Sequence, residues 1–196
     1  MATMHYLFFG VLSVAVLFFG GINNSAIKRE VAEDQLRSMA MGARPGHADR
    51  TENFRENIVN IAVQEIGMRE ATGNNDGKRV EEYLTYTGLG KGYAWCAAFV
   101  SWCYGKAGRS VPSNAWSPAL FPKARRYSQR QIQGDAIRPA DLFGIYNRQL
   151  ARIDHVGIVR KIERNWILTV EGNVANRVVS KRRAVLAIYA FSNWLD

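Results

Sequence analysis

Residues 93–105 of this 196-residue chain, YAWCAAFVSWCYG, form an apolar run that predicts a helix from about Trp95 to Lys106. The run holds both cysteines of the chain, Cys96 at its start and Cys103 seven residues further on. Seven residues of helix separate two Cα atoms by about 10 Å, whereas a disulfide tolerates about 7 Å at most. We therefore expect two free thiols, one at the beginning of the helix and one inside it.

Helices are predicted before this segment and strands after it. Apolar residues at three- and four-residue steps predict an amphipathic helix over 53–68, and a shorter helix is expected over 80–86. Short spacings between the later apolar segments indicate hairpins and an antiparallel meander. The layout is α+β, with N-terminal helices packed on an antiparallel β-sheet. The predicted strands are 141–146, 155–162, 166–174, 177–182 and 187–192.

The N-terminal segment differs from the rest of the chain. Residues 6–22, YLFFGVLSVAVLFFGGI, are uncharged and almost wholly apolar, which is typical of a signal peptide or membrane anchor. A buried helix of an intracellular protein is the third alternative. We expect 1–26 to be the leader, 27–52 a linker and 53–196 one domain. The protein is then exported to the periplasm or cell envelope, and tethered to the inner membrane if 6–22 is retained.

The chain is strongly basic, with a formal net charge of +9. Such a charge favours anionic partners, among them nucleic acid, phospholipid head groups and a bacterial cell wall. Export separates the protein from most nucleic acid, and the sequence has no nucleic-acid recognition motif, so we expect no such partner. The basic clusters at 123–130 and 180–183 either bind an anionic wall or form ordinary solvated faces. A monomer without metal or cofactor is expected.

Cys96 is the candidate nucleophile because the start of a helix favours a thiolate. Cys103, two turns further among aromatic residues, is expected to be a small core residue. Taken alone, Cys96 also fits a buried core cysteine, so the assignment depends on a base, usually histidine. His5 lies in the leader and His47 in the linker, which leaves His155 at the beginning of a strand.

The strand after His155 supplies candidate partners for its imidazole. Gly157 lies on the same face of the strand as His155 and leaves that face open beside the ring. On the next strand, Glu171 and Asn173 share a face. A hairpin loop with an odd number of residues places His155 opposite one of these two, whereas an even loop does not.

These segments together resemble the CHAP family of cysteine peptidoglycan amidases and endopeptidases, which is related to NlpC-like cell-wall peptidases of papain-like fold. The resemblance covers about residues 54–194. One segment, PADLFGIY at 139–146, departs from the usual Gly-Asp at the start of its strand. The segments that carry the resemblance are YAWCAAFVSWCYG, SNAWSPALF at 113–121, RPADLFGIY at 138–146, DHVGIVRKI at 154–162 and TVEGNV at 169–174.

The resemblance implies an active site made of a helix-start cysteine, a histidine that opens a strand, and an acidic or amide residue on the following strand. It thereby assigns the catalytic roles to Cys96, His155 and Glu171, with Asn173 as the fourth position. Whether Glu171 or Asn173 orients the histidine stays open.

The implied function is hydrolysis of an amide bond in peptidoglycan, by an amidase or an endopeptidase that uses a thiol mechanism. Tyr93, Trp95 and Trp116 are expected to bind substrate, although the two tryptophans fit a core equally well. The alternatives are a thiol protease or transpeptidase acting on proteins, and a non-catalytic wall-binding module.

Overall fold

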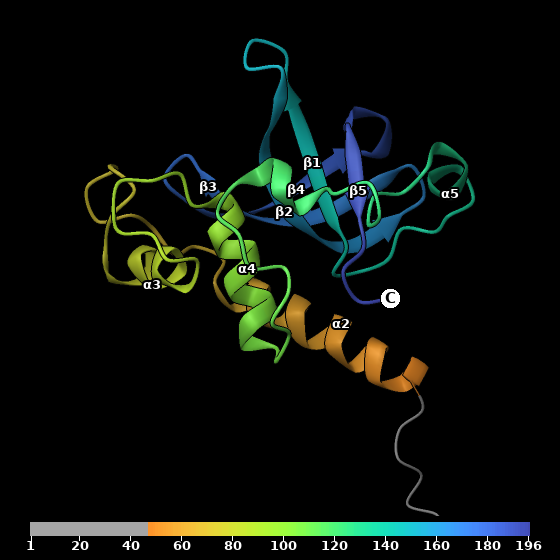
Figure 1. The fold of residues 1–196 in the computed structure, drawn as a ribbon, viewed down its shortest axis with the longest axis horizontal. Coiled ribbons are helices and arrows are strands. Elements are labelled where there is room, and N and C mark those ends of the chain that lie inside the picture. The colour runs from red at the N-terminus through yellow and green to blue at the C-terminus, as the bar shows by residue number, and fades with distance from the viewer. Residues whose placement is uncertain (1–46) are drawn as a thin grey trace, which may run out of the picture. The chain divides into compact units, whose positions relative to one another are not determined.

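In the computed structural model, which describes residues 47–196, helices come first along the chain and a five-stranded sheet comes last (Figure 1). The α+β order expected from the sequence is confirmed. The helical elements are α2 (His47–Gln64), α3 (Lys78–Tyr86), α4 (Cys96–Lys106), η1 (Ser117–Leu120), α5 (Gln129–Gln133) and η2 (Val185–Ala187). The strands are β1 (Leu142–Asn147), β2 (Arg152–Glu163), β3 (Trp166–Val174), β4 (Arg177–Ala184) and β5 (Ala190–Ser192).

The predicted leader and most of the predicted linker lie outside the described residues. Within 47–196, no helix is both long enough and apolar enough to cross a membrane. Helix α2 begins at His47 and ends at Gln64, whereas the sequence predicted 53–68. The first turns of α2 are mostly polar and exposed, so they add nothing to the apolar periodicity from which the helix was predicted.

The strands are ordered β4-β3-β2-β1-β5, and all neighbouring pairs are antiparallel. The predicted meander is correct for β1 to β4. It is wrong for β5, which returns to pair with β1, where Leu142 lies opposite Ser192. The reason is burial: all three residues of β5 are buried, and β4 leaves most of its residues partly or fully exposed. By pairing with β1, β5 also covers an otherwise open sheet edge.

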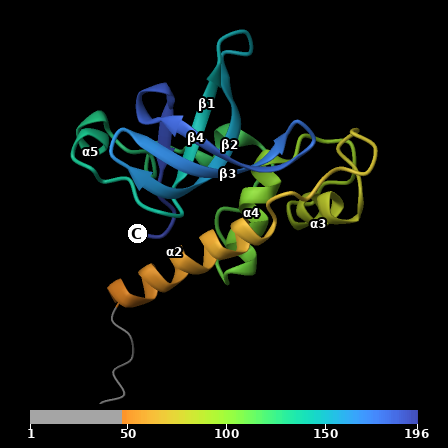
Figure 2. The ribbon, with the colours of Figure 1, turned by 180° about the vertical axis from the view of Figure 1, so that it is seen from behind.

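Helix α4 is buried over nearly its whole length and packs against β2 and β3. Its N-terminal end lies at the sheet, and its C-terminal end points away from it (Figure 1). Gly172 of β3 permits this close approach, because a Cβ at that position would lie 2.7 Å from Cζ3 of Trp95 and 2.9 Å from Cβ of Phe99. Seen from behind, α2 runs along the same side of the sheet as α4 (Figure 2).

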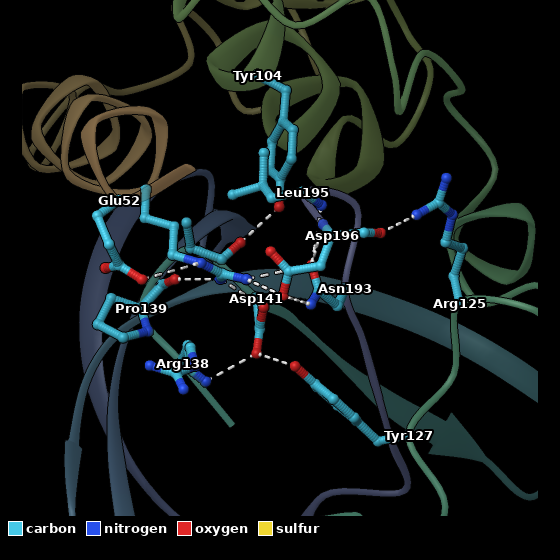
Figure 3. Close-up of polar contacts among 12 residues, drawn as sticks. Glu52, Tyr104, Arg125, Tyr127, Arg138, Pro139, Asp141, Asn193, Leu195 and Asp196 are labelled. Atoms are coloured by element: carbon cyan, nitrogen blue, oxygen red, sulfur yellow. Dashed lines mark hydrogen bonds and ion pairs between the residues drawn. The ribbon is translucent and has the colours of Figure 1, made fainter. Parts of the chain in front are cut away.

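A buried ion pair ties α2 to the beginning of β1 (Figure 3). Nη1 of Arg55 donates to Oδ1 of Asp141 at 2.8 Å, and the two side chains are 2% and 1% exposed. Nη2 of Arg55 also donates to Asp196, at 3.1 Å. From α4, the hydroxyl of Tyr104 donates to the carbonyl oxygen of Ala140, next to this pair. The cluster therefore fixes α2 and α4 against the start of the sheet.

Candidate active site

Cys96 is the first residue of α4, so its thiol lies at the positive end of the helix dipole. It is buried, with 4% of its surface exposed. Cys103 lies deeper in the same helix and is fully buried, and both cysteines are free thiols, as predicted. Burial raises the pKa of the Cys103 thiol well above its ordinary value. The two thiols therefore differ in environment, and only Cys96 is placed to ionise.

His155 lies on β2 between the thiol and a buried carboxylate. Its Nε2 is 2.9 Å from Oε2 of Glu171, which leaves Nδ1 as the ring nitrogen available to Cys96. The imidazole also meets the ring of Phe143 edge to face, with the ring centroids 6.3 Å apart. The structure thus brings together one residue from a helix and one from each of two neighbouring strands.

The charges of Cys96 and His155 stabilise one another. Burial opposes ionisation of Cys96, but the hydrogen bond to His155 and the charge of the imidazolium outweigh it, so the pKa of Cys96 is lowered. For His155, burial lowers the pKa, whereas the hydrogen bonds to Cys96 and Glu171 raise it, with a net pKa of about 9. These shifts favour a thiolate–imidazolium pair near neutral pH.

Ser117, which we did not predict as a site residue, lies against the thiol. This buried residue begins η1, and its Oγ is 3.4 Å from Sγ of Cys96. A hydroxyl that donates to the sulfur favours the thiolate, and this contact contributes to the lowered pKa of Cys96. The neighbouring Trp116 was noted in the sequence, but nothing in the pattern of the loop distinguishes Ser117 from its other serines.

Glu171 lies on β3 with its side chain fully buried. Thr169, two positions earlier on the same face, donates its hydroxyl to Oε1 at 2.6 Å. Arg183 of β4 donates to both carboxylate oxygens, from Nε and Nη2, each at 2.7 Å. Burial acts to raise the pKa of Glu171, but the hydrogen bonds from Arg183, His155 and Thr169 lower it to about 2. Glu171 is therefore held as a carboxylate.

The hairpin between β2 and β3 differs from the predicted odd-numbered loop. Glu163 pairs with Trp166, so the loop has two residues. Such a loop alone would direct the side chains of His155 and Glu171 to opposite faces of the sheet. However, the register shifts where β2 carries one additional residue, Arg160, relative to β3. This bulge reverses the alternation and returns both side chains to one face.

Gly157 has no side chain, and the room that this leaves is filled by Phe143 and Glu171, so the face is not open as the sequence suggested. A Cβ at Gly157 would lie 2.6 Å from Cε1 of Phe143 and 3.0 Å from Cγ of Glu171. The missing side chain therefore allows Glu171 to reach diagonally across the sheet toward His155.

Asn173, the alternative partner, takes a different position. Its Nδ2 donates to Oε1 of Glu70 at 3.1 Å and to Oδ1 of Asn75 at 2.9 Å. The register of β3 with β4 shifts after Glu171, and Asn173 has a left-handed φ of 61°. The structure thus places Glu171 against His155 and uses Asn173 to tie β3 to the loop before α3.

Trp95 is a core residue, which corrects its expected place in a substrate groove. Its ring is fully buried and lies 5.6 Å from that of Tyr83, and its indole N–H donates to Glu70 at 2.7 Å. A side chain with no exposed surface has no area to offer a substrate. The direct link between Trp95 and Glu70 instead stabilises the chain entering α4.

Tyr93 and Trp116, by contrast, are 58% and 56% exposed. Both line an open cavity of about 460 Å³, together with Ala94, Ala115 and other residues of the same two loops. Ala94 shortly precedes Cys96 and Trp116 precedes Ser117 along the chain, so the two loops that line this cavity lead into residues of the site. The rings of Tyr93 and Trp116 are therefore exposed at this cavity, unlike the buried ring of Trp95.

Comparison with known protein families gives an independent finding. Residues 88–173 match the family model described as CHAP domain. The matched range includes Cys96, Ser117, His155 and Glu171, and it ends before Arg183. No curated protein matches the chain. The α+β arrangement agrees with the CHAP, papain-like fold.

Proposed function

We propose that this protein, whose residues 88–173 match the CHAP domain model, is a peptidoglycan hydrolase that cleaves an amide bond with Cys96 as the nucleophile. CHAP domains are generally hydrolases, and the family implies a peptidoglycan substrate. One observation supports the assignment most strongly: Cys96 is hydrogen-bonded to His155, and His155 is hydrogen-bonded to Glu171. A nucleophile, a base and an orienting carboxylate in this order are the parts that thiol-dependent amide hydrolysis requires.

In the proposed reaction, the thiolate of Cys96 attacks the carbonyl carbon of the amide. The backbone N–H groups at the start of α4, including that of Cys96, stabilise the negative oxygen. The C–N bond then breaks, the imidazolium of His155 gives its proton to the leaving amine, and a thioester remains on Cys96.

Water completes the reaction. Neutral His155 removes a proton from a water molecule, whose oxygen attacks the thioester carbonyl. The C–S bond breaks, which releases a carboxylic acid product and restores the thiolate–imidazolium pair. Glu171 keeps the imidazole in orientation through both steps and balances its charge.

The cavity lined by Tyr93 and Trp116 supports a role for these two residues in substrate binding. Tyr93 and Trp116 present exposed rings to this cavity from the loops that precede Cys96 and Ser117. Aromatic rings combine a large apolar face with a polar edge, which suits a substrate made of sugars and short peptides. We propose that these two residues hold the glycan or stem peptide next to Cys96.

Mass spectrometry of fragments released from purified peptidoglycan tests the proposal and identifies the bond. The variant C96A should release no fragments, whereas C103A, which changes the buried thiol of the same helix, should retain activity. Glycan strands freed of whole stem peptides would identify an amidase, and cleaved stem peptides an endopeptidase. Full activity of C96A would exclude Cys96 as nucleophile. Binding to the wall without release would favour a binding module, and cleavage of protein substrates alone would favour a thiol protease.

We also propose that residues 1–26 export the protein to the periplasm or cell envelope, and that the mature protein is a monomer. The uncharged, apolar composition of residues 6–22 supports export. Cell fractionation with sequencing of the mature N-terminus would distinguish cleavage from retention as an anchor. Recovery of the full chain in the cytosol would contradict the proposal.

A further inference from the structure

We propose that Arg183 is a positioning residue of this site, which holds Glu171 as a carboxylate and directs it toward His155. This inference rests on the proposed function and adds to it a residue from the edge strand β4. Position 183 lies outside the range that matches the CHAP family model. It also belongs to the basic cluster 180–183, for which the sequence suggested only wall binding or a solvated face.

The contact between Arg183 and Glu171 is bidentate. Nε donates to Oε1 and Nη2 donates to Oε2, each at 2.7 Å. Two parallel hydrogen bonds fix the plane of a carboxylate as well as its position, which a single cation on a flexible stem does not do. With its plane fixed in this way, Glu171 presents Oε2 to Nε2 of His155.

The position of Arg183 in the sheet explains why an arginine is needed. It pairs with Ile167, four residues before Glu171 on β3, a separation of about 13 Å along a strand. The side chain therefore runs along the face of the sheet, and its guanidinium lies 5.5 Å from the centroid of Phe143, the ring beside His155. A long, flat cation fits this path, whereas lysine has neither the fork nor the planar head.

The charges in the site also require a counter-charge on the far side of Glu171. When Cys96 and His155 are ionised, the order of charges is thiolate, imidazolium, carboxylate and guanidinium, which sums to zero. Without Arg183, two negative groups would share one positive group in a buried site, and burial of an uncompensated charge is strongly unfavourable. Glu171 would then take up a proton more readily and would stabilise the imidazolium less.

The test is the rate at which iodoacetamide alkylates Cys96, measured against pH by peptide mass spectrometry of the purified protein. R183M removes the charge and the fork, and R183K restores the charge alone. R182M is the matched control, because Arg182 lies on the same strand but its side chain is half exposed and stacks over Trp166. This readout needs no peptidoglycan, so it is independent of the substrate.

We expect R183M to move the acid limb of the alkylation profile upward by about one pH unit, equivalent to about a tenfold loss of rate on that limb. R183K should recover part of the loss, and R182M should match the wild type. If R183M unfolds, R183K carries the test, because it keeps the charge beside Glu171 and loses only the fork: its acid limb should still lie above that of the wild type, and a folded R183K with the wild-type profile would show that the fork is not needed.

A folded R183M with the wild-type profile would overturn the role of Arg183, as would an equal loss in R182M. If Cys96 in the wild-type protein reacts as slowly as Cys103, the proposed catalytic function itself fails, which is a different result from either of these.

Discussion

Nε2 of His155 and Oε2 of Glu171 lie 2.9 Å apart, although the two residues are 16 positions apart on neighbouring strands. Neither an ideal two-residue hairpin nor a side chain at position 157 would permit this contact. The ionised states of Cys96, His155 and Glu171 depend on this contact.

Hydrolytic activity should have a bell-shaped dependence on pH. Activity should fall as pH rises through about 9, because His155 then loses the proton that it gives to the leaving amine. It should also fall as pH drops through the lowered pKa of Cys96, because the thiolate is then protonated. The dependence of kcat/KM on pH measures both limits. A rate that keeps rising above pH 9 would contradict the ion pair.

S117A should raise the pKa of Cys96, because the hydroxyl no longer stabilises the thiolate. A hydrogen bond to a charged group contributes roughly 1.5 kcal/mol, so the alkylation rate on the acid limb should fall roughly tenfold. The matched control is S110A, at an exposed serine earlier in the same connection. Equal alkylation of S117A and wild type across the pH range would remove Ser117 from the site.

G157A should disturb the contact between His155 and Glu171, since the added Cβ meets Phe143 at 2.6 Å. Overpacking of a buried site costs about 1–3 kcal/mol in the free energy of unfolding, and activity should fall as well. G90A adds the same methyl where no atom lies within 4 Å, so it should leave both quantities unchanged. Urea denaturation measures stability, and fragment release measures activity. Wild-type values of both for G157A would show that the site accommodates a methyl group at position 157.

W116A should raise KM for soluble peptidoglycan fragments with a smaller effect on kcat, because we propose that this exposed ring binds substrate but takes no part in the reaction. W166A is the control, at another partly exposed tryptophan, which lies on the β2–β3 hairpin and does not line the cavity. An unchanged KM for W116A would place the substrate elsewhere.

R55M should destabilise the fold through the ion pair with Asp141. Removal of one partner from a buried pair costs about 3–5 kcal/mol, because the other charge stays buried without compensation. E52Q changes a 62%-exposed carboxylate 4.0 Å from the same guanidinium, and its effect should stay within about 0.5 kcal/mol. Chemical denaturation measures both, and similar stability of R55M and wild type would show that the site of Asp141 tolerates an unpaired acid.

The sequence by itself determined the features that depend on local pattern. The apolar run at 93–105 predicted α4, and the apolar patterns of the later segments predicted the strands β1 to β4, each to within a few residues. The start of the helix marked Cys96, and the position of Cys103 inside it predicted a buried thiol. The same patterns led to His155 and to the pair Glu171 and Asn173.

Only the tertiary structure decided which of these side chains meet. The choice of Glu171 over Asn173 follows from a bulge at Arg160 and a second register shift in β3, and β-bulges leave no reliable mark in apolar alternation. Ser117 and Arg183 reach the site from segments 21 and 12 residues away from their partners. Such contacts are set by strand order and side-chain length across the sheet, which the spacing of residues along one segment does not contain.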